Sequence, residues 1–122
     1  MKQIRIGVVG TGHLGSYHIQ KYLKMPECRV VGVADLSEEN ARKAAAGRNF
    51  DILTDCRGLL GKVDAVSIAV PTGAHHEVAA IFLKAGIDVL LEKPIATTLA
   101  EAEELIELAD AKKLVFQIGF VE

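Results

Sequence analysis

Short apolar runs alternate with longer amphipathic stretches along the whole 122-residue chain. The apolar runs predict strands at 4–9, 29–34, 52–53, 65–70, 87–91 and 114–119. The stretches between them predict helices over 13–24, 37–47, 74–85 and from 98 onward, with a helical turn near 56–60. Strands joined by helices of this length pair in parallel, through right-handed crossovers. The pattern therefore predicts an α/β fold, a doubly wound and mostly parallel six-stranded sheet with helices on both faces.

Two of the predicted helices carry recognisable start signals. Ser37 precedes Glu38 and Glu39, acids that the helix dipole favours in a first turn. Thr98 with Glu101 three residues later forms a capping box. The helix that Thr98 opens is expected to bury one apolar face, made of Leu99, Ala102, Leu105, Ile106 and Ala109.

Composition and charge exclude several classes of partner. The net charge of −2 offers no basic field for a phosphate polymer, so we expect neither nucleic acid nor an anionic membrane as partner. No apolar run approaches the roughly 20 residues that span a bilayer. Glycines interrupt the N-terminal run, unlike a signal peptide, and we expect a cytoplasmic protein. Cys28 and Cys56 lack C-x-x-C spacing and are expected to be reduced and partly buried, and the four histidines lack metal-site spacing.

A glycine-rich motif joins the first predicted strand to the first predicted helix. Its sequence is Gly10-Thr11-Gly12-His13-Leu14-Gly15, a G-x-G-x-x-G. Alone the motif would be weak, but here it has the strand before it and the helix after it. Gly10 would permit the tight turn, Gly12 the approach of a pyrophosphate, and Gly15 close packing of the helix. The sextet therefore predicts a dinucleotide site at the helix N-terminus.

An acid closes the second predicted strand. Asp35 lies 20 residues after Gly15, where a carboxylate can accept hydrogen bonds from the adenosine ribose. A 2′-phosphate would meet like charge there, which favours NAD over NADP. Arg42, further along the next helix, could reach back to such a phosphate, so NADP remains an alternative cofactor. Methyltransferases also use a glycine-rich first turn, but their usual G-x-G-x-G spacing differs from this one.

Two later strand ends carry residues suited to chemistry. Pro71-Thr72-Gly73-Ala74-His75-His76 follows the fourth predicted strand and is expected to hold imidazoles over the nicotinamide end of a crevice. Glu92-Lys93-Pro94 follows the fifth, and a lysine there could act as a proton donor toward a substrate hydroxyl or carbonyl. The alternative interpretation is structural, with His76 as an exposed residue at a helix start and Glu92-Lys93 as a solvated loop.

These residues together resemble the N-terminal domain of the Gfo/Idh/MocA oxidoreductases, over essentially the whole chain. The matching segments are the glycine sextet with His18, then Asp35, Pro71-Thr72, His75, Ala85-Gly86 and Val89 to Pro94. The resemblance implies that Lys93 is the catalytic lysine and that Glu92 and Lys93 contact the cofactor. It also implies that Pro71, Thr72 and His75 pass the nicotinamide ribose, and that Pro94 can follow a cis peptide.

Members of this family continue into a second α/β domain that holds the substrate. We therefore expect residues 1–122 to be the NAD(P)-binding domain of a longer protein, without the substrate domain, and the full-length protein to be a homo-oligomer. The ending 118–122 resembles relatives that act on nucleotide-linked N-acetyl sugars. The expected activity is hydride transfer between a sugar or polyol hydroxyl and NAD. The alternatives are an NAD(H)-sensing or interaction module, which would not need Lys93, so an undiminished function in Lys93→Ala would favour them.

Overall fold

The computed structural model describes residues 3–119, with only the backbone of residues 13 and 14. It contains a six-stranded sheet in the order β3-β2-β1-β4-β5-β6, in which every pairing is parallel. The predicted fold class is confirmed. The strands are β1 (Ile4–Val9), β2 (Cys28–Ala34), β3 (Asp51–Leu53), β4 (Ala65–Ile68), β5 (Asp88–Glu92) and β6 (Phe116–Gly119).

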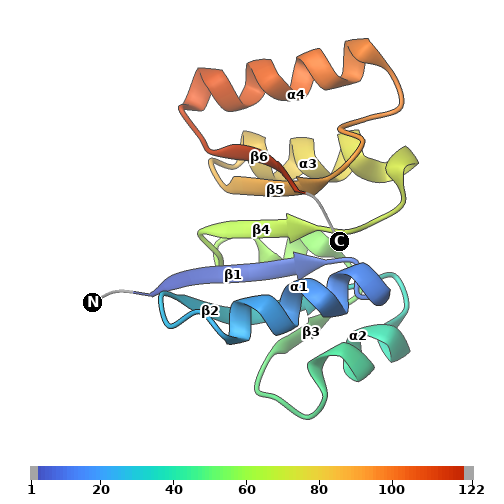
Figure 1. The fold of residues 1–122 in the computed structure, drawn as a ribbon, viewed down its shortest axis with the longest axis vertical. Helices are drawn as coiled ribbons and strands as arrows, with labels where there is room; N and C mark the ends of the chain where they lie inside the picture. The colour runs from blue at the N-terminus through green and yellow to red at the C-terminus, as the bar shows by residue number, and fades with distance from the viewer. Residues whose placement is uncertain (1–2, 120–122) are drawn as a thin grey trace.

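The helices divide between the two halves of the sheet (Figure 1). They are α1 (His13–Leu23), α2 (Glu38–Ala45), α3 (His75–Lys84) and α4 (Leu99–Lys112), with 3₁₀ turns η1 (Cys56–Leu59) and η2 (Thr72–Ala74). From β1 the chain moves outward to β3, and from β4 it moves outward in the opposite direction to β6. Right-handed crossovers in opposite directions place α1 and α2 on one face of the sheet, and α3 and α4 on the other.

Each face of the sheet has its own apolar core. Against α1 and α2 the buried side chains include Ile6, Val8 and Ile19. Against α3 and α4 the larger cluster includes Phe82 and Leu105. Because both faces of the central strands are covered, these strands read as continuous apolar runs in the sequence.

The helix caps follow the sequence, but the buried face of α4 differs from the prediction. The hydroxyl of Thr98 accepts a hydrogen bond from the N–H of Glu101, as expected. Leu99 and Ile106, predicted to face inward, are instead 76% and 43% exposed. The buried stripe of α4 is narrower and centred on Leu105, Leu108 and Ala109, because the helix packs mainly against α3 at one end of the sheet.

Two further expectations concerned the two cysteines and the lack of a membrane-spanning segment. Cys28 and Cys56 are both partly buried and outside any disulfide, as predicted. Within residues 3–119, no helix is long and apolar enough to cross a membrane.

The sheet topology creates a switch point between β1 and β4. Their neighbours depart in opposite directions, so the loops after β1 and β4 diverge at the carboxyl edge of the sheet. In a doubly wound sheet this is where ligands bind. The residues that follow the strands here are Gly10 after β1, Asp35 after β2, Ala69 after β4 and Lys93 after β5.

Candidate functional site

The three glycines of the sextet have different surroundings. Gly10 has φ +88°, and a Cβ placed on it would lie 2.6 Å from the carbonyl oxygen of Ala69. A Cβ on Gly15 would lie 1.8 Å from the carbonyl oxygen of Gly10. Gly12 differs, since a Cβ there would meet nothing within 4 Å. Gly10 and Gly15 are therefore needed by the fold itself, whereas Gly12 leaves open space against the backbone that a ligand can enter.

The N-terminus of α1 faces this open space without a side-chain cap. Gly12 is the N-cap residue and has no side chain with which to bind the first N–H groups. The first turn contains no acid to neutralise the positive end of the helix dipole. The first N–H groups of a helix lack partners within the helix. An anion such as a phosphate satisfies both the hydrogen bonds and the dipole.

Asp35 is fixed by hydrogen bonds to the glycine turn and to the start of α2. Its Oδ2 accepts from the N–H and from the hydroxyl of Thr11, both at 2.8 Å, and its Oδ1 accepts from the N–H of Ser37 at 2.8 Å. Partial burial raises the pKa of Asp35, but the hydrogen bonds from Ser37 and Thr11 outweigh it and hold the pKa below its ordinary value. Oδ1 retains a lone pair that can accept one more hydrogen bond, such as one from a ribose hydroxyl.

Acid should therefore weaken the fold partly through Asp35. The contribution of a carboxylate with a lowered pKa is complete above its unfolded-state pKa and is lost as pH falls through the folded value. We expect the free energy of unfolding to fall as the pH is lowered through and below the ordinary aspartate pKa of about 3.9, and to fall less steeply in Asp35→Asn. Urea unfolding at each pH measures this. Equal slopes in the two proteins would contradict the assignment.

A cavity of about 640 Å³ lies along the carboxyl edge of the sheet. Five residues that the sequence predicted to bind the cofactor line part of it, namely Gly10, Thr11, Gly12, Asp35 and Pro71. Its volume lies within the range of cofactor pockets.

Most of the wall of this cavity was not predicted. Sequence analysis missed residues from the starts of α2 and η1 and from one face of α3, namely Leu36, Asn40, Thr54, Asp55, Cys56, Arg57, Glu77, Val78 and Ile81. The sequence offered one signal for this wall, the position of Leu36 directly after Asp35, the acid that ends a strand. In the structure the Leu36 side chain is 95% exposed. The cavity also carries more acidic than basic groups, with Asp35, Asp55 and Glu77 against Arg57.

Five other predicted residues lie outside the cavity wall, and one of them is Gly15, which is buried. His75 was expected over the crevice, but its ring is only 1% exposed and lies beneath the surface. Glu92 is also buried, so any effect of either on a cofactor is indirect. Thr72 begins η2 and is half-buried. Lys93 is exposed, directly after β5. The side chains of His13 and Leu14 lie outside the described part of the chain.

His75 connects the loop after β4 to the loop after β5. Its Nδ1 lies 2.8 Å from the carbonyl oxygen of Pro94, and its Nε2 lies 2.9 Å from that of Val70. Val70 lines the cavity. The Lys93–Pro94 segment is thereby placed beside the cavity, and the peptide bond joining these two residues is cis, as the resemblance implies.

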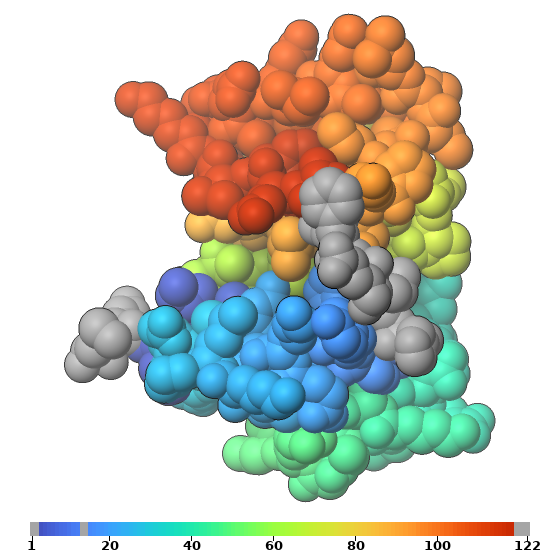
Figure 2. All heavy atoms as spheres, in the orientation of Figure 1, coloured from blue at the N-terminus to red at the C-terminus, as the bar shows by residue number. Residues whose placement is uncertain are grey.

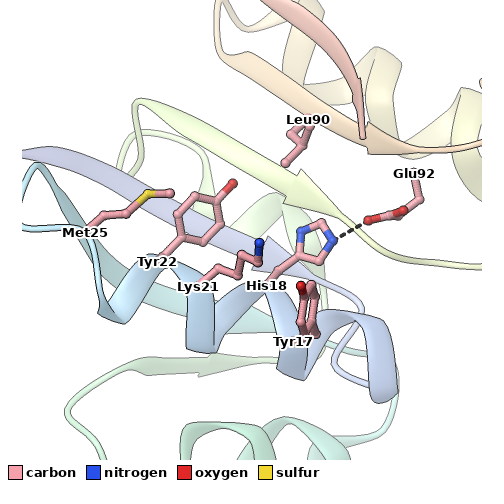
Figure 3. Close-up of a pocket in the computed structure, with 7 residues that line it drawn as sticks. All are labelled: Tyr17, His18, Lys21, Tyr22, Met25, Leu90 and Glu92. Carbon is pink, nitrogen blue, oxygen red and sulfur yellow. Dashed lines mark hydrogen bonds and ion pairs between the residues drawn. The ribbon is translucent and has the colours of Figure 1, made fainter. Parts of the chain in front are cut away.

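A second, smaller trough of about 140 Å³ lies between α1 and β5, and Glu92 forms part of its wall. On the face shown in Figure 2 it lies between the blue atoms of α1 and the orange and red atoms of β5 and β6. Figure 3 shows that His18 points from α1 toward Glu92, and its Nε2 binds Oε1 of that carboxylate. The trough is lined by Tyr17, His18, Lys21, Tyr22, Met25, Leu90 and Glu92.

Comparison with known proteins gives the family. Residues 4–120 match the model of the oxidoreductase family with an NAD-binding Rossmann fold. The chain belongs to the Gfo/Idh/MocA oxidoreductases. Within this family it is 39% identical over 122 residues to UDP-N-acetylglucosamine 3-dehydrogenase of Acidithiobacillus ferrooxidans, covering 100% of this chain and 38% of that protein. The solved structure of that enzyme matches with a TM-score of 0.89 and 40% identity, covering 98% of this chain and 39% of that one.

Two other Gfo/Idh/MocA-like structures were solved with bound ligands. Scyllo-inositol dehydrogenase from Lactobacillus casei, with NAD(H) and scyllo-inositol, matches with a TM-score of 0.89 and 27% identity over 97% of this chain and 36% of that one. The 3-ketoreductase KijD10 from Actinomadura kijaniata was solved as a K102A mutant with TDP-benzene and NADP. It matches with a TM-score of 0.90 and 26% identity, over 98% of this chain and 39% of that one. This chain thus spans less than two-fifths of the length of these relatives.

Proposed function

We propose that the chain is the NAD-binding domain of a dehydrogenase that oxidises a hydroxyl group of a sugar or polyol. The observation that carries this proposal is the cavity in which the open backbone at Gly12 and the carboxylate of Asp35 face the same space. A dinucleotide needs both features, a cradle of N–H groups for its pyrophosphate and an acceptor for its ribose.

The charge of the cavity favours NAD over NADP. NADP carries an additional phosphate on the ribose that Asp35 would bind, and the acidic groups of the cavity outnumber the basic ones. Arg42, which could have reached back, is engaged by Glu38 at 3.0 Å and does not line the cavity. Arg57 does line it, but has Asp55 at 3.6 Å.

Lys93 is proposed as the group that handles the substrate proton. The register pairs Ile68 with Leu91 at the ends of β4 and β5, so the residues after the two strands share one edge. A nicotinamide bound at this edge supplies the acceptor for a hydride. As the neutral amine, Lys93 accepts at Nζ the proton that the substrate hydroxyl releases, and the resulting ammonium returns it to the carbonyl oxygen in the reverse direction.

The substrate class is proposed from the relatives. One is named a dehydrogenase of UDP-N-acetylglucosamine, and another was solved with scyllo-inositol. Both molecules present secondary hydroxyls on a six-membered ring. We propose a nucleotide-linked N-acetyl sugar as the first substrate to test, since the former relative shares 39% identity with the whole of this chain.

Calorimetric titration with NADH, and in parallel with NADPH, tests the cofactor assignment. We expect a dissociation constant for NADH in the micromolar range and at least about tenfold weaker binding of NADPH. Asp35→Ala should abolish NADH binding. Asp35→Asn keeps an oxygen for the ribose but removes the charge, so it should narrow the difference between the two nucleotides.

Asp110→Ala is the matched control, because Asp110 is an exposed acid of α4 that does not line the cavity. It should bind both nucleotides as the unmodified chain does. A thermal melt of each variant shows whether lost binding reflects lost folding. A folded chain that binds neither nucleotide would overturn the proposal, and equal binding of the two would overturn the preference for NAD.

A further inference from the structure

Buried imidazoles hold the segment that carries Lys93 on both of its sides. His18, on α1, binds the carboxylate of Glu92, the residue before Lys93 (Figure 3). His75, the first residue of α3, contacts the carbonyl oxygen of Pro94, the residue after it. Because α1 and α3 lie on opposite faces of the sheet, the two contacts restrain the segment from opposite directions.

The contact with Pro94 also fixes the segment relative to the cavity. The second ring nitrogen of His75 lies 2.9 Å from the carbonyl oxygen of Val70, a residue of the cavity wall. A carbonyl oxygen only accepts, so the ring is the donor in either hydrogen bond, and a doubly protonated ring donates in both at once. The imidazole thus bridges the two loops whose spacing decides how far Lys93 lies from a nicotinamide.

We propose that His75 and His18 are positioning residues, which orient Lys93 toward the nicotinamide by fixing the backbone on either side of it. This inference rests on the proposed function. Lysine has a long and flexible side chain, so the position of its backbone sets the volume that Nζ can reach. Displacement of a catalytic group by about 1 Å can lower a rate about 100-fold. Neither ring needs to touch the cofactor, since both are buried.

Two substitutions separate positioning from mere stability. The side-chain nitrogen of asparagine lies where Nδ1 of histidine lies, so His75→Asn can still donate to Pro94. The nitrogen of glutamine lies near the position of Nε2, so His75→Gln can donate to Val70 but not to Pro94. Each variant keeps an N–H donor for one of the two carbonyl oxygens and offers none to the other, so similar decreases in thermal stability are expected.

The measurement is an NMR titration of the chain with ¹³C at the lysine Cε positions. The Lys93 signal is assigned by its disappearance in Lys93→Arg. NADH is compared with ADP-ribose, which has the same adenosine and pyrophosphate but no nicotinamide. The Lys93 signal should shift with NADH and not with ADP-ribose in the unmodified chain and in His75→Asn. In His75→Gln the shift should be lost, while the dissociation constant of ADP-ribose changes by less than about threefold.

His18 is tested in the same way. Glutamine at position 18 can reach Glu92 from the ε position, whereas the shorter asparagine cannot, so the NADH shift should persist in His18→Gln and be lost in His18→Asn. The same NADH shift in His75→Gln as in His75→Asn, or no shift of Lys93 in a chain that binds NADH, would overturn the positioning role. Failure of both NADH and ADP-ribose to bind would instead overturn the proposed function, and this inference with it.

Discussion

Gly15→Ala is expected to lower the free energy of unfolding by about 3 kcal/mol or more. The added Cβ would lie 1.8 Å from the carbonyl oxygen of Gly10, which is backbone and cannot rotate away as a side-chain end would. Either the first turn of α1 or the turn after β1 must move, and Ile19 and Val8 are packed on both sides of that junction. Urea unfolding measures the loss, and a decrease in Tm of about 10 °C or more is expected alongside it.

Gly12→Ala is the matched control for this prediction. Gly12 has φ −71°, which alanine adopts easily, and its Cβ would enter open space. Stability should change by less than about 1 kcal/mol. Affinity for NADH should nonetheless fall about 10- to 100-fold, because the methyl group separates the pyrophosphate from N–H groups worth about 1.5–3 kcal/mol each. Equal destabilisation by the two substitutions would contradict the distinction between a packing glycine and a binding glycine.

If the proposed function holds, Lys93→Met is expected to lower the kcat of the full-length protein about 100- to 10,000-fold, assayed first with UDP-N-acetylglucosamine and NAD. Methionine keeps much of the length and apolar stem of lysine but cannot accept or donate the proton. The dissociation constant of NADH should stay within about threefold of the original value, since we propose that the glycine turn and Asp35 supply most of the binding.

The control for this substitution is Lys84→Met, at an exposed position in the last turn of α3. It removes the same charge from the domain away from the cavity, and kcat should not change. A Lys93→Met protein that retains full turnover would exclude Lys93 as the proton acceptor.

The fold could be predicted because its signals are local. Apolar runs, Ser37, Thr98 and the glycine sextet each act within a few residues of their own position, and the strands lie within a few residues of the predicted bounds. Leu99 and Ile106 could not be predicted in the same way. Whether an apolar residue of a helix is covered depends on how wide a stripe its neighbours bury, and α4 packs on a narrow one.

The same contrast between local signals and tertiary packing applies to the candidate site. Gly10 and Asp35 are recognisable because each follows a strand directly, whereas Val78 and Ile81 reach the cavity only through the packing of α3. His75 shows the opposite error. Its position after a strand suggested a ligand, yet its ring is buried with both nitrogens near backbone carbonyl oxygens. A histidine and its backbone partners 5 and 19 residues away carry no signal that one sequence can reveal.

The position of β1 at the centre of the sheet has a consequence for synthesis on the ribosome. The first strand of this sheet to be made is a central strand that pairs with β2 on one edge and β4 on the other, and β4 begins only at Ala65. At 5–20 residues per second, the intervening stretch of about 60 residues takes about 3 to 12 s to make. Throughout that time Ile6, Val8 and Val9 have an unpaired edge on one side. The nascent chain is therefore most prone to aggregation before β4 appears, and this interval is when chaperone contact with the first strand would protect it.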